Sequence, residues 1–416
     1  MRRVTDADAD ADAVAAWAAS GAMALTGRAD GPPRVAPGAP ALRVREALAA
    51  VARSTEARTG RAPRLPGVGL LGERASIAGL GRRGPWSCGG SFRAFPAADG
   101  WFGISLPRDD DLSLVPALVE ADPAGDPWAA VAAWARDRSA AEAEERAALL
   151  GLAGAAAPPD LGGHAGTRPG VVSTPGGVRR LPERPLVLDL SSLWAGPLCA
   201  HLLGLAGCRV VKVESTGRPD GTRRGPAAFF DLLHGGHDSV ALDFGDADER
   251  RRLADLVARA DLVIEASRPR ALAGLGIDAA AHVAAGTTWV SITARGRDSN
   301  TIGFGDDVAV AAGLALPDAD ELLPVGDALA DPLTGVAAAA AATAALLGET
   351  ATLVDVSMLD VARAAAGTVP EAAVHRHDGR WWVESAGGRH PVAGPEHRRP
   401  TGPGPVLGAD RGRWVR

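Results

Sequence analysis

The sequence predicts an α/β protein whose main part is a parallel sheet buried on both faces. From residue 184 onward, short apolar runs alternate with stretches of helical periodicity, as strands and crossover helices do in βαβ units. Before residue 155 the pattern differs, because residues 93–107 indicate a hairpin that turns at Asp99-Gly100 and residues 127–153 indicate two helices. We therefore expect a second, smaller part ahead of the parallel sheet.

The expected elements follow in chain order. Residues 12–60 indicate helices interrupted by a Gly/Pro-rich loop, GRADGPPRVAPGAP. The expected strands of the sheet are the apolar runs 184–190, 209–214, 239–244, 261–266, 287–294 and 352–357. The expected helices between them are 195–207, 249–260 and 336–348. This alternation is typical of a parallel sheet with helices on its faces.

A Pro/Gly-rich segment, residues 155–184, separates the two patterns. Its few apolar residues follow neither the helical nor the strand period, which is typical of a linker. The expected organisation is an N-terminal portion (1–154), a linker (155–184) and a C-terminal α/β domain (185–416).

Charge and composition exclude several classes of protein. With 44 Lys and Arg against 50 Asp and Glu the net charge is −6, which argues against nucleic acid as a partner. We find no signal peptide and no apolar run that would cross a membrane, so no membrane partner is expected. Three cysteines are too few for a disulfide framework, and the cytoplasm is the expected location. Lys212 is the only lysine.

Two short motifs carry little weight. GLGRRG at 79–84 has the glycine spacing of a dinucleotide-binding loop, but Pro85 follows it where a helix should begin. The missing fingerprint also disfavours a Rossmann dehydrogenase. His234 and His237 stand three residues apart without a third ligand nearby, so we expect no metal site.

Ligands of open α/β sheets bind at the carboxyl ends of the strands. The loops at such positions are 191–197, 266–272 and the approach to helix 336–348. Acidic pairs stand out in two loops, Asp306 with Asp307 and Asp327 with Asp331. From spacing alone, an Asp before an apolar helix is more often an N-cap or turn residue than a catalytic group.

Three segments, which begin with RPLVLDLSSLWAGP, GDALADPLTG and RRPTGPGPVLGAD, resemble in the correct order the family III CoA-transferases of the CaiB/BaiF type. The first is residues 184–276, from RPLVLDLSSLWAGP to DLVIEASRPRALAGLG. The second joins GDALADPLTGVAAAAAATAAL to LVDVSMLDVA (353–362), and the third is RRPTGPGPVLGADRGRW. The resemblance implies a Rossmann-like parallel sheet with a smaller α+β domain, and an enzyme that moves CoA from an acyl-CoA to a carboxylic acid.

The same resemblance implies that Asp331 is the nucleophile. The family's catalytic Asp stands four positions before a Gly that opens the next helix, here Gly335, and Asp327 lies one turn too early. A carboxylate at a helix N-terminus is expected to stay ionised, and the dipole stabilises charge on an attacked carbonyl. Asp331 would form a mixed anhydride with the acyl group and then an aspartyl-CoA thioester, from which the acceptor carboxylate takes the CoA.

For CoA, the resemblance implies contacts from loops at three strand ends. The residues concerned are Leu193, Trp194, Ala195, Leu242, Ala266, Ser267 and Arg268. Arg268 is the candidate partner for phosphate, since a guanidinium can donate two hydrogen bonds to it. Ser215 and Gly245 stand where the family commonly has basic residues. No permanently bound cofactor and no metal are implied, because CoA and acyl-CoA are substrates.

The N-terminal portion resembles a second, partial copy of the family's later half. The matching stretches are 20–33, 45–62 and 93–107. Residues 37–45 contain no acid at the position that matches Asp331, so we interpret this portion as a degenerate copy that supplies the small domain. The alternative is that residues 12–62 are generic Ala-rich helices. Because the family folds as an interlocked dimer, the resemblance implies a homodimer, or a fusion that supplies partner surface in cis.

Two other functions stay open at this point. The superfamily includes α-methylacyl-CoA racemases, whose base pair includes a His directly before an Asp. The matching pair here is Gly305-Asp306, which lacks that proton carrier and favours the transferase. A CoA-binding pseudoenzyme is the non-catalytic alternative, because several CoA contacts are replaced. The sequence names neither the acyl donor nor the acceptor.

Overall fold

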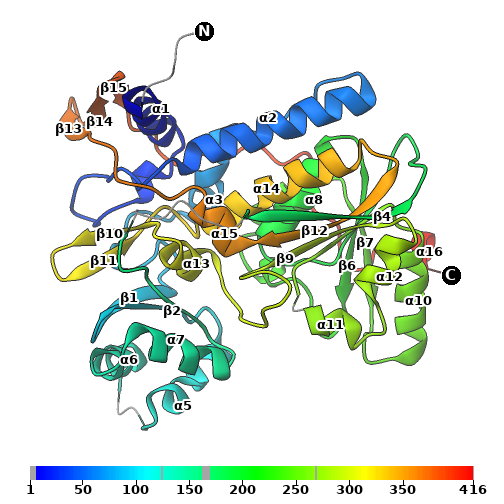
Figure 1. The fold of residues 1–416 in the computed structure, drawn as a ribbon, viewed down its shortest axis with the longest axis horizontal. Coiled ribbons are helices and arrows are strands. Elements are labelled where there is room, and N and C mark those ends of the chain that lie inside the picture. The colour runs from blue at the N-terminus through cyan, green and yellow to red at the C-terminus, as the bar shows by residue number, and fades with distance from the viewer. Residues whose placement is uncertain (1–5, 123–124, 162–168, 268, 416) are drawn as a thin grey trace.

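The computed structural model describes residues 6–122, 125–161, 169–267 and 269–415, and its centre is a seven-stranded sheet (Figure 1). The strand order is β4-β12-β9-β8-β5-β6-β7. These strands are β4 (Val171–Val178), β5 (Leu186–Asp189), β6 (Arg209–Ser215), β7 (Asp238–Leu242), β8 (Leu262–Glu265), β9 (Thr288–Thr293) and β12 (Thr350–Ser357). All neighbours are parallel except β4 with β12. The expected α/β fold with a largely parallel sheet is confirmed.

Helices cover both faces of this sheet. One face carries α8 (Ala195–Leu205), α9 (Ala227–His234) and α14 (Ala330–Ala345). The other carries α10 (Ala247–Ala258), α11 (Pro269–Ala273) and α12 (Ala279–Ala284). Strand β9 is buried along its whole length, as expected of a strand covered from both sides.

The strand order reverses at β5. From β5 the chain passes through α8 to β6 and on to β7, and then returns to β8, which pairs with the opposite edge of β5. Ligands of open α/β sheets bind beyond the carboxyl ends of the strands at such a reversal. The loops that follow β5 and β8 therefore lie where a ligand is expected.

A small α+β unit precedes the sheet in sequence and lies at the lower left in Figure 1. Its strands are β1 (Phe92–Ala97), β2 (Gly100–Ser105) and β3 (Ala153–Ala156), paired in antiparallel fashion. Its helices are α4 (Asp109–Ser113), α5 (Val115–Val119), α6 (Pro127–Arg136) and α7 (Ala140–Leu149). Helix α7 begins with a capping box in which Ser139 and Glu142 each accept the other's backbone N–H. The expected hairpin and helical pair are both confirmed.

The first helices of the chain pack on the C-terminal domain. They are α1 (Asp6–Ala19), η1 (Met23–Leu25), α2 (Pro40–Thr59), η2 (Val68–Gly72) and α3 (Glu73–Ala78). Helix α2 lies along α14 (Figure 1). Apolar residues of α1 and α2, such as Trp17 and Val51, belong to the same core as Leu198 of α8 and Val290 of β9. The N-terminal helices therefore share a core with the α/β domain. That they descend from a partial copy of the family stays a prediction.

The segment expected to be a linker, residues 155–184, is not a linker throughout. Residues 171–178 form β4, which pairs with β12 at the edge of the large sheet. The strand signal is missing because β4 is largely exposed and contains Pro175 and two glycines. A Cβ at Gly176 or Gly177 would overlap Val283 or Ala284 of α12, so these positions need glycine to let the helix approach the strand.

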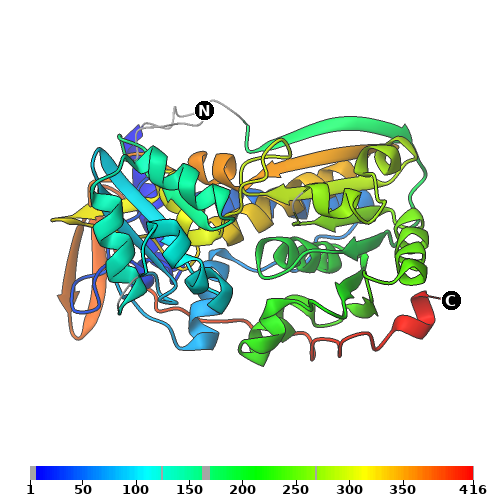
Figure 2. The same cartoon turned by 90° about the horizontal axis from the view of Figure 1, so that it is seen from below.

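The remaining elements complete the fold. They are η3 (Gly221–Arg224), α13 (Gly305–Ala311), β10 (Ala315–Asp318), β11 (Glu321–Pro324), α15 (Met358–Arg363), β13 (Ala373–His377), β14 (Arg380–Ser385), β15 (Gly388–Pro391) and α16 (Arg411–Trp414). The C-terminal segment is red in Figure 2. At its start the N–H of Ala393 donates to the carbonyl of Ala18 at 2.9 Å, and near its end the N–H of Asp410 donates to the carbonyl of Ser239 at 2.9 Å. Across the described ranges, no helix has the length and apolar character needed to cross a bilayer.

Candidate active site

Asp331 lies in the first turn of α14. The helix begins at Ala330, six residues earlier than expected, so Gly335 lies in its second turn and does not open it. The expectation for Gly335 was wrong because Pro332 is tolerated in a first turn, where backbone N–H groups have no partner within the helix. Glycine at 335 serves packing instead, since a Cβ there would lie 2.7 Å from the carbonyl oxygen of Ala195 in α8. The N-termini of α8 and α14 thereby meet.

A tight turn before α14 brings three carboxylates together. Ala328 has a φ of 45°, its N–H donates to Asp306 Oδ1 at 3.0 Å, and its carbonyl accepts the N–H of Asp331 at 3.0 Å. The backbone N–H of Gly305 donates to the Asp331 carboxylate. Asp327 stands between these groups in sequence and belongs to the same cluster, because its charge acts on both other carboxylates.

Gly305 leaves no room for a side chain. A Cβ at this position would overlap the carbonyl oxygen of Ala328 and would lie 2.5 Å from Asp331 Oδ2. A histidine could not stand here without moving the turn that holds the acidic cluster. The structure thus gives a steric reason for the missing proton carrier of the racemase pattern.

The N-terminal portion adds one guanidinium to this cluster. Arg74 of α3 forms a two-point ion pair with Asp327, with 2.9 Å between Nε and Oδ2. The guanidinium carbon also lies 5.2 Å from the ring centroid of Trp194. Asp327 is 1% exposed and already paired, whereas Asp331 is half-buried, so Asp331 is the more accessible of the two carboxylates.

The electrostatics of the cluster follow from burial and like charge. Burial raises the pKa of Asp331 to about 7, with Arg74 opposing the rise and Asp306 adding to it. Burial likewise raises the pKa of Asp306 to about 6, and the charge of Asp327 contributes. Asp331 is therefore only partly ionised at neutral pH, contrary to the expectation that it stays ionised, because burial and the neighbouring carboxylates outweigh Arg74 and the Gly305 N–H. Such raised values are typical of catalytic carboxyl groups.

The loop after β5 carries three of the expected CoA contacts. Leu193 is 41% exposed with a φ of 71°, while Trp194 and Ala195 are buried. The ring of Trp194 packs edge-on against Phe229, with 5.5 Å between centroids. A left-handed φ is strained for leucine, so the surrounding contacts must hold this loop in place.

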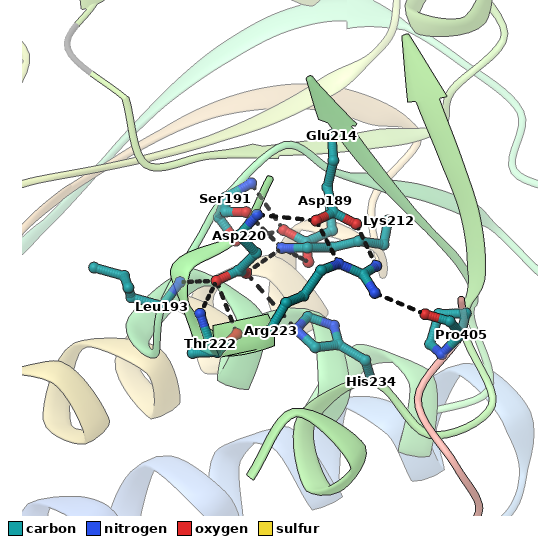
Figure 3. Close-up of polar contacts among 10 residues, drawn as sticks. All are labelled: Asp189, Ser191, Leu193, Lys212, Glu214, Asp220, Thr222, Arg223, His234 and Pro405. Carbon is teal, nitrogen blue, oxygen red and sulfur yellow. Dashed lines mark hydrogen bonds and ion pairs between the residues drawn. The ribbon is translucent and has the colours of Figure 1, made fainter. Parts of the chain in front are cut away.

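A buried ion cluster under the loop supplies those contacts (Figure 3). Lys212 of β6 donates to the carbonyl of Ser191 at 2.6 Å and lies 2.8 Å from Asp220 Oδ2 and 3.4 Å from Asp189 Oδ2. Asp220 in turn accepts the N–H of Leu193 at 3.1 Å. The side chains of Lys212, Asp189 and Asp220 are fully buried, so the only lysine of the chain fixes both ends of the Ser191–Leu193 loop.

Burial disfavours the charged form of every group in this cluster, and the balance between burial and ion pairing decides the direction in which each pKa shifts. Burial is the largest single effect at Asp220, but Lys212 and the backbone N–H groups of Thr222 and Leu193 together outweigh it and lower the pKa of Asp220. At Asp189 burial prevails and raises the pKa. The two carboxylates outweigh burial at Lys212 and raise its pKa. His234, 3.9 Å from Asp220, has a pKa well below its usual value, through burial and the charge of Lys212, and is therefore neutral.

The other expected CoA contacts fall into two groups. Ala266 and Ser267 follow β8, next to β5, so the structure brings them to the same edge as Leu193. Leu242 ends β7, and its fully buried side chain offers no surface to a ligand. Arg268 lies outside the described residues.

The structure also places the two short motifs that carried little weight in the sequence. GLGRRG at 79–84 begins at the glycine that ends α3 and is followed by no helix, so it is no dinucleotide loop. His234 and His237 lie with ring centroids 5.6 Å apart. Among the described residues, no three His, Cys, Asp or Glu side chains are grouped so as to hold a metal ion.

Sequence reasoning missed Arg74 and the Lys212–Asp220 pair. Arg74 pairs with a residue 253 positions away, and nothing in its local sequence distinguishes it from other arginines. Lys212 carried one signal, namely that it is the only lysine in the chain.

Comparisons with known proteins converge on one family. Residues 185–407 match the family described as CoA-transferase family III. A succinyl-CoA:mesaconate CoA-transferase of Haloarcula hispanica is 37% identical over 89 residues, which are 19% of this chain and 22% of that protein. A succinyl-CoA:glutarate CoA-transferase of Mus musculus is 31% identical over 177 residues, 39% of this chain and 40% of that protein.

A solved structure is also similar to part of the chain. A CaiB/BaiF family protein of Brucella suis matches with 22% identity and a TM-score of 0.45, over 51% of this chain and 67% of that one. The chain thus spans well under half the length of the curated relatives that it matches. Since the family match extends over more than half of the 416 residues, the chain belongs to CoA-transferase family III.

Proposed function

We propose that the protein transfers CoA from an acyl-CoA to a carboxylic acid through a covalent aspartyl-CoA thioester on Asp331. The single observation that carries this proposal is the half-buried Asp331 carboxylate at the N-terminus of α14, in a chain of this family and beside the strand-order reversal. Its neighbour Asp327 is buried and paired with Arg74, which leaves Asp331 as the available nucleophile.

Each step of the reaction exchanges one acyl bond for another. The Asp331 carboxylate attacks the thioester carbonyl, the C–S bond breaks, and CoA leaves as thiolate from a mixed anhydride. The thiolate then attacks the Asp331 carbonyl, releasing the donor carboxylate and leaving the aspartyl-CoA thioester. The acceptor carboxylate repeats these steps in reverse and restores free Asp331.

The loop after β5 and the loop after β8 are the proposed CoA site. Leu193 and Ala266 are exposed there, whereas the Ser267 hydroxyl oxygen is buried and has no hydrogen-bond partner among the described residues. Arg268 is proposed as the phosphate partner from its place in the sequence. A homodimer and a cytoplasmic location stay predictions.

The test is intact-mass detection of an adduct after incubation with acetyl-, succinyl- and other acyl-CoAs. We expect a mass increase of one CoA minus water that hydroxylamine removes. Asp331→Asn should form none, because an amide keeps the shape but is a very poor nucleophile. An adduct in Asp331→Asn but not in Asp327→Asn would place the nucleophile one turn earlier. CoA binding without an adduct from any donor would indicate a pseudoenzyme.

The racemase alternative has a separate test. Proton transfer at both faces of an α-carbon needs two positioned bases, and Gly305 provides none. We expect no rapid deuterium uptake with inversion from a 2-methylacyl-CoA in heavy water. Rapid uptake with inversion would overturn the transferase proposal.

A further inference from the structure

The acidic cluster around Asp331 has a charge imbalance. Asp331 faces Asp306 of α13, Asp327 of the turn before α14 and Arg74 of α3. The buried Cys88 thiol also lies near, but burial raises its pKa well above its usual value, so it is neutral. Among the described residues of this cluster, three carboxylates are thus matched by a single guanidinium.

That guanidinium is held in place from several sides. It forms the two-point ion pair with Asp327 and stacks on Trp194. The preceding residue, Glu73, is itself paired with Arg398, with 3.0 Å between Nη2 and Oε2. The short helix α3 is therefore anchored to the C-terminal segment, and Arg74 cannot swing away from the cluster without losing its partners.

We propose that Arg74 is a positioning residue for the reaction: by pairing with Asp327 it leaves Asp331 as the carboxylate that ionises and attacks. This inference rests on the proposed function of Asp331. It also assigns the N-terminal portion a direct part in the site, since α3 supplies the charge within the same chain. An opposite charge within a few ångströms lowers a carboxyl pKa by about 1–3 units, so its removal has a measurable consequence.

The test follows the pH dependence of adduct formation in a single turnover at saturating acyl-CoA. In the wild type the rate should fall below a pH of about 7, where Asp331 becomes protonated. In Arg74→Gln this acid limb of the pH profile, the range in which the rate falls with falling pH, should move up by about one pH unit or more. The rate at pH 6 should then be about tenfold lower than in the wild type. Arg74→Lys, which keeps the charge but not the two-point geometry, should show a smaller shift.

Two controls separate charge from structure. Arg82→Gln removes another arginine of the same portion, one that donates to three backbone carbonyls and makes no ion pair with the cluster, and its limb should stay in place. The double variant Arg74→Gln/Asp327→Asn lacks both the cation and one anion, so its limb should return toward the wild-type position. Should Arg74→Gln fail to fold, Arg74→Lys and the double variant still carry the test.

The outcomes discriminate between the two proposals. A uniform loss of rate at every pH in Arg74→Gln, with the limb unmoved, would overturn the role of Arg74 while leaving Asp331 as nucleophile. An equal shift in Arg82→Gln would also overturn it. Absence of any adduct in the wild type would instead refute the proposed function.

Discussion

Replacing Lys212 by methionine tests the buried ion cluster beneath the loop that follows β5. Methionine keeps most of the side-chain volume but leaves Asp220 in the interior without its cation, and both side chains are fully buried. Removing one partner of a buried pair costs about 3–5 kcal/mol, so the free energy of unfolding should fall by that amount at pH 7. Urea unfolding followed by circular dichroism measures it.

The stability deficit of Lys212→Met should depend on pH, and its direction follows from the pKa of Asp220. In the wild type the pKa of Asp220 is lowered in the folded protein. The stabilisation that this carboxylate contributes is therefore fully present above about pH 3.9, the pKa of Asp in an unfolded chain, and is lost only as the pH falls further. Without Lys212 burial raises that pKa, and protonation then relieves the penalty by about 1.4 kcal/mol per pH unit. The deficit of Lys212→Met should therefore shrink between pH 7 and pH 5.

A double variant provides the control. Asn at position 220 retains an oxygen that accepts the N–H groups of Leu193 and Thr222 but carries no charge. Lys212→Met/Asp220→Asn should recover part of the lost stability at pH 7. Its remaining deficit should change less between pH 7 and pH 5, because only Asp189 is then left buried without the ammonium. A deficit of less than about 1 kcal/mol in Lys212→Met, or one that is equal at both pH values, would refute the reasoning.

Three further substitutions probe other contacts. Gly335→Ala should force α14 away from the Ala195 carbonyl and lower the free energy of unfolding in urea by about 1–3 kcal/mol. An unchanged urea midpoint would mean that α14 can move away from α8 without a loss of stability. Ser105→Ala removes the 2.7 Å hydrogen bond to the buried Asp307, whose pKa burial raises to about 7. At pH 8 the substitution should lower the free energy of unfolding by about 1–3 kcal/mol, and an unchanged value would contradict a stabilising contact between β2 and α13. Arg268→Ala should raise the KM for acyl-CoA more than it lowers kcat, and an equal KM would remove it from the site.

The fold was predictable where local pattern and burial agree. Each apolar run named from the sequence coincides with a strand, because a strand covered on both faces needs apolar residues at every position. The pattern failed at β4, whose exposed edge position and close contact with α12 favour Gly and Pro over apolar residues. It also misplaced the start of α14, where Asp331 and Pro332 do not fit the apolar signal of a helix.

The site was predictable only in part, for a physical reason. A resemblance along the chain identifies Asp331 and the loop after β5, but charge balance depends on groups that folding brings together. Arg74 comes from the portion expected to be degenerate, and Lys212 acts from a neighbouring strand through a backbone carbonyl. Contacts of this kind produce no periodic pattern in the sequence from which they could be predicted.

Arg74 and Lys212 act on the two sides of one stretch of chain. Lys212 fixes Ser191 and, through Asp220, the N–H of Leu193, while the guanidinium of Arg74 covers the next side chain, Trp194. The same guanidinium pairs with Asp327 in the turn that leads to Asp331. A displacement of the β5 loop would therefore change the position of Arg74 and, with it, the charge that acts on Asp331. The Lys212–Asp220 pair and the guanidinium of Arg74 therefore both hold the β5 loop, the first through its backbone and the second through the Trp194 side chain.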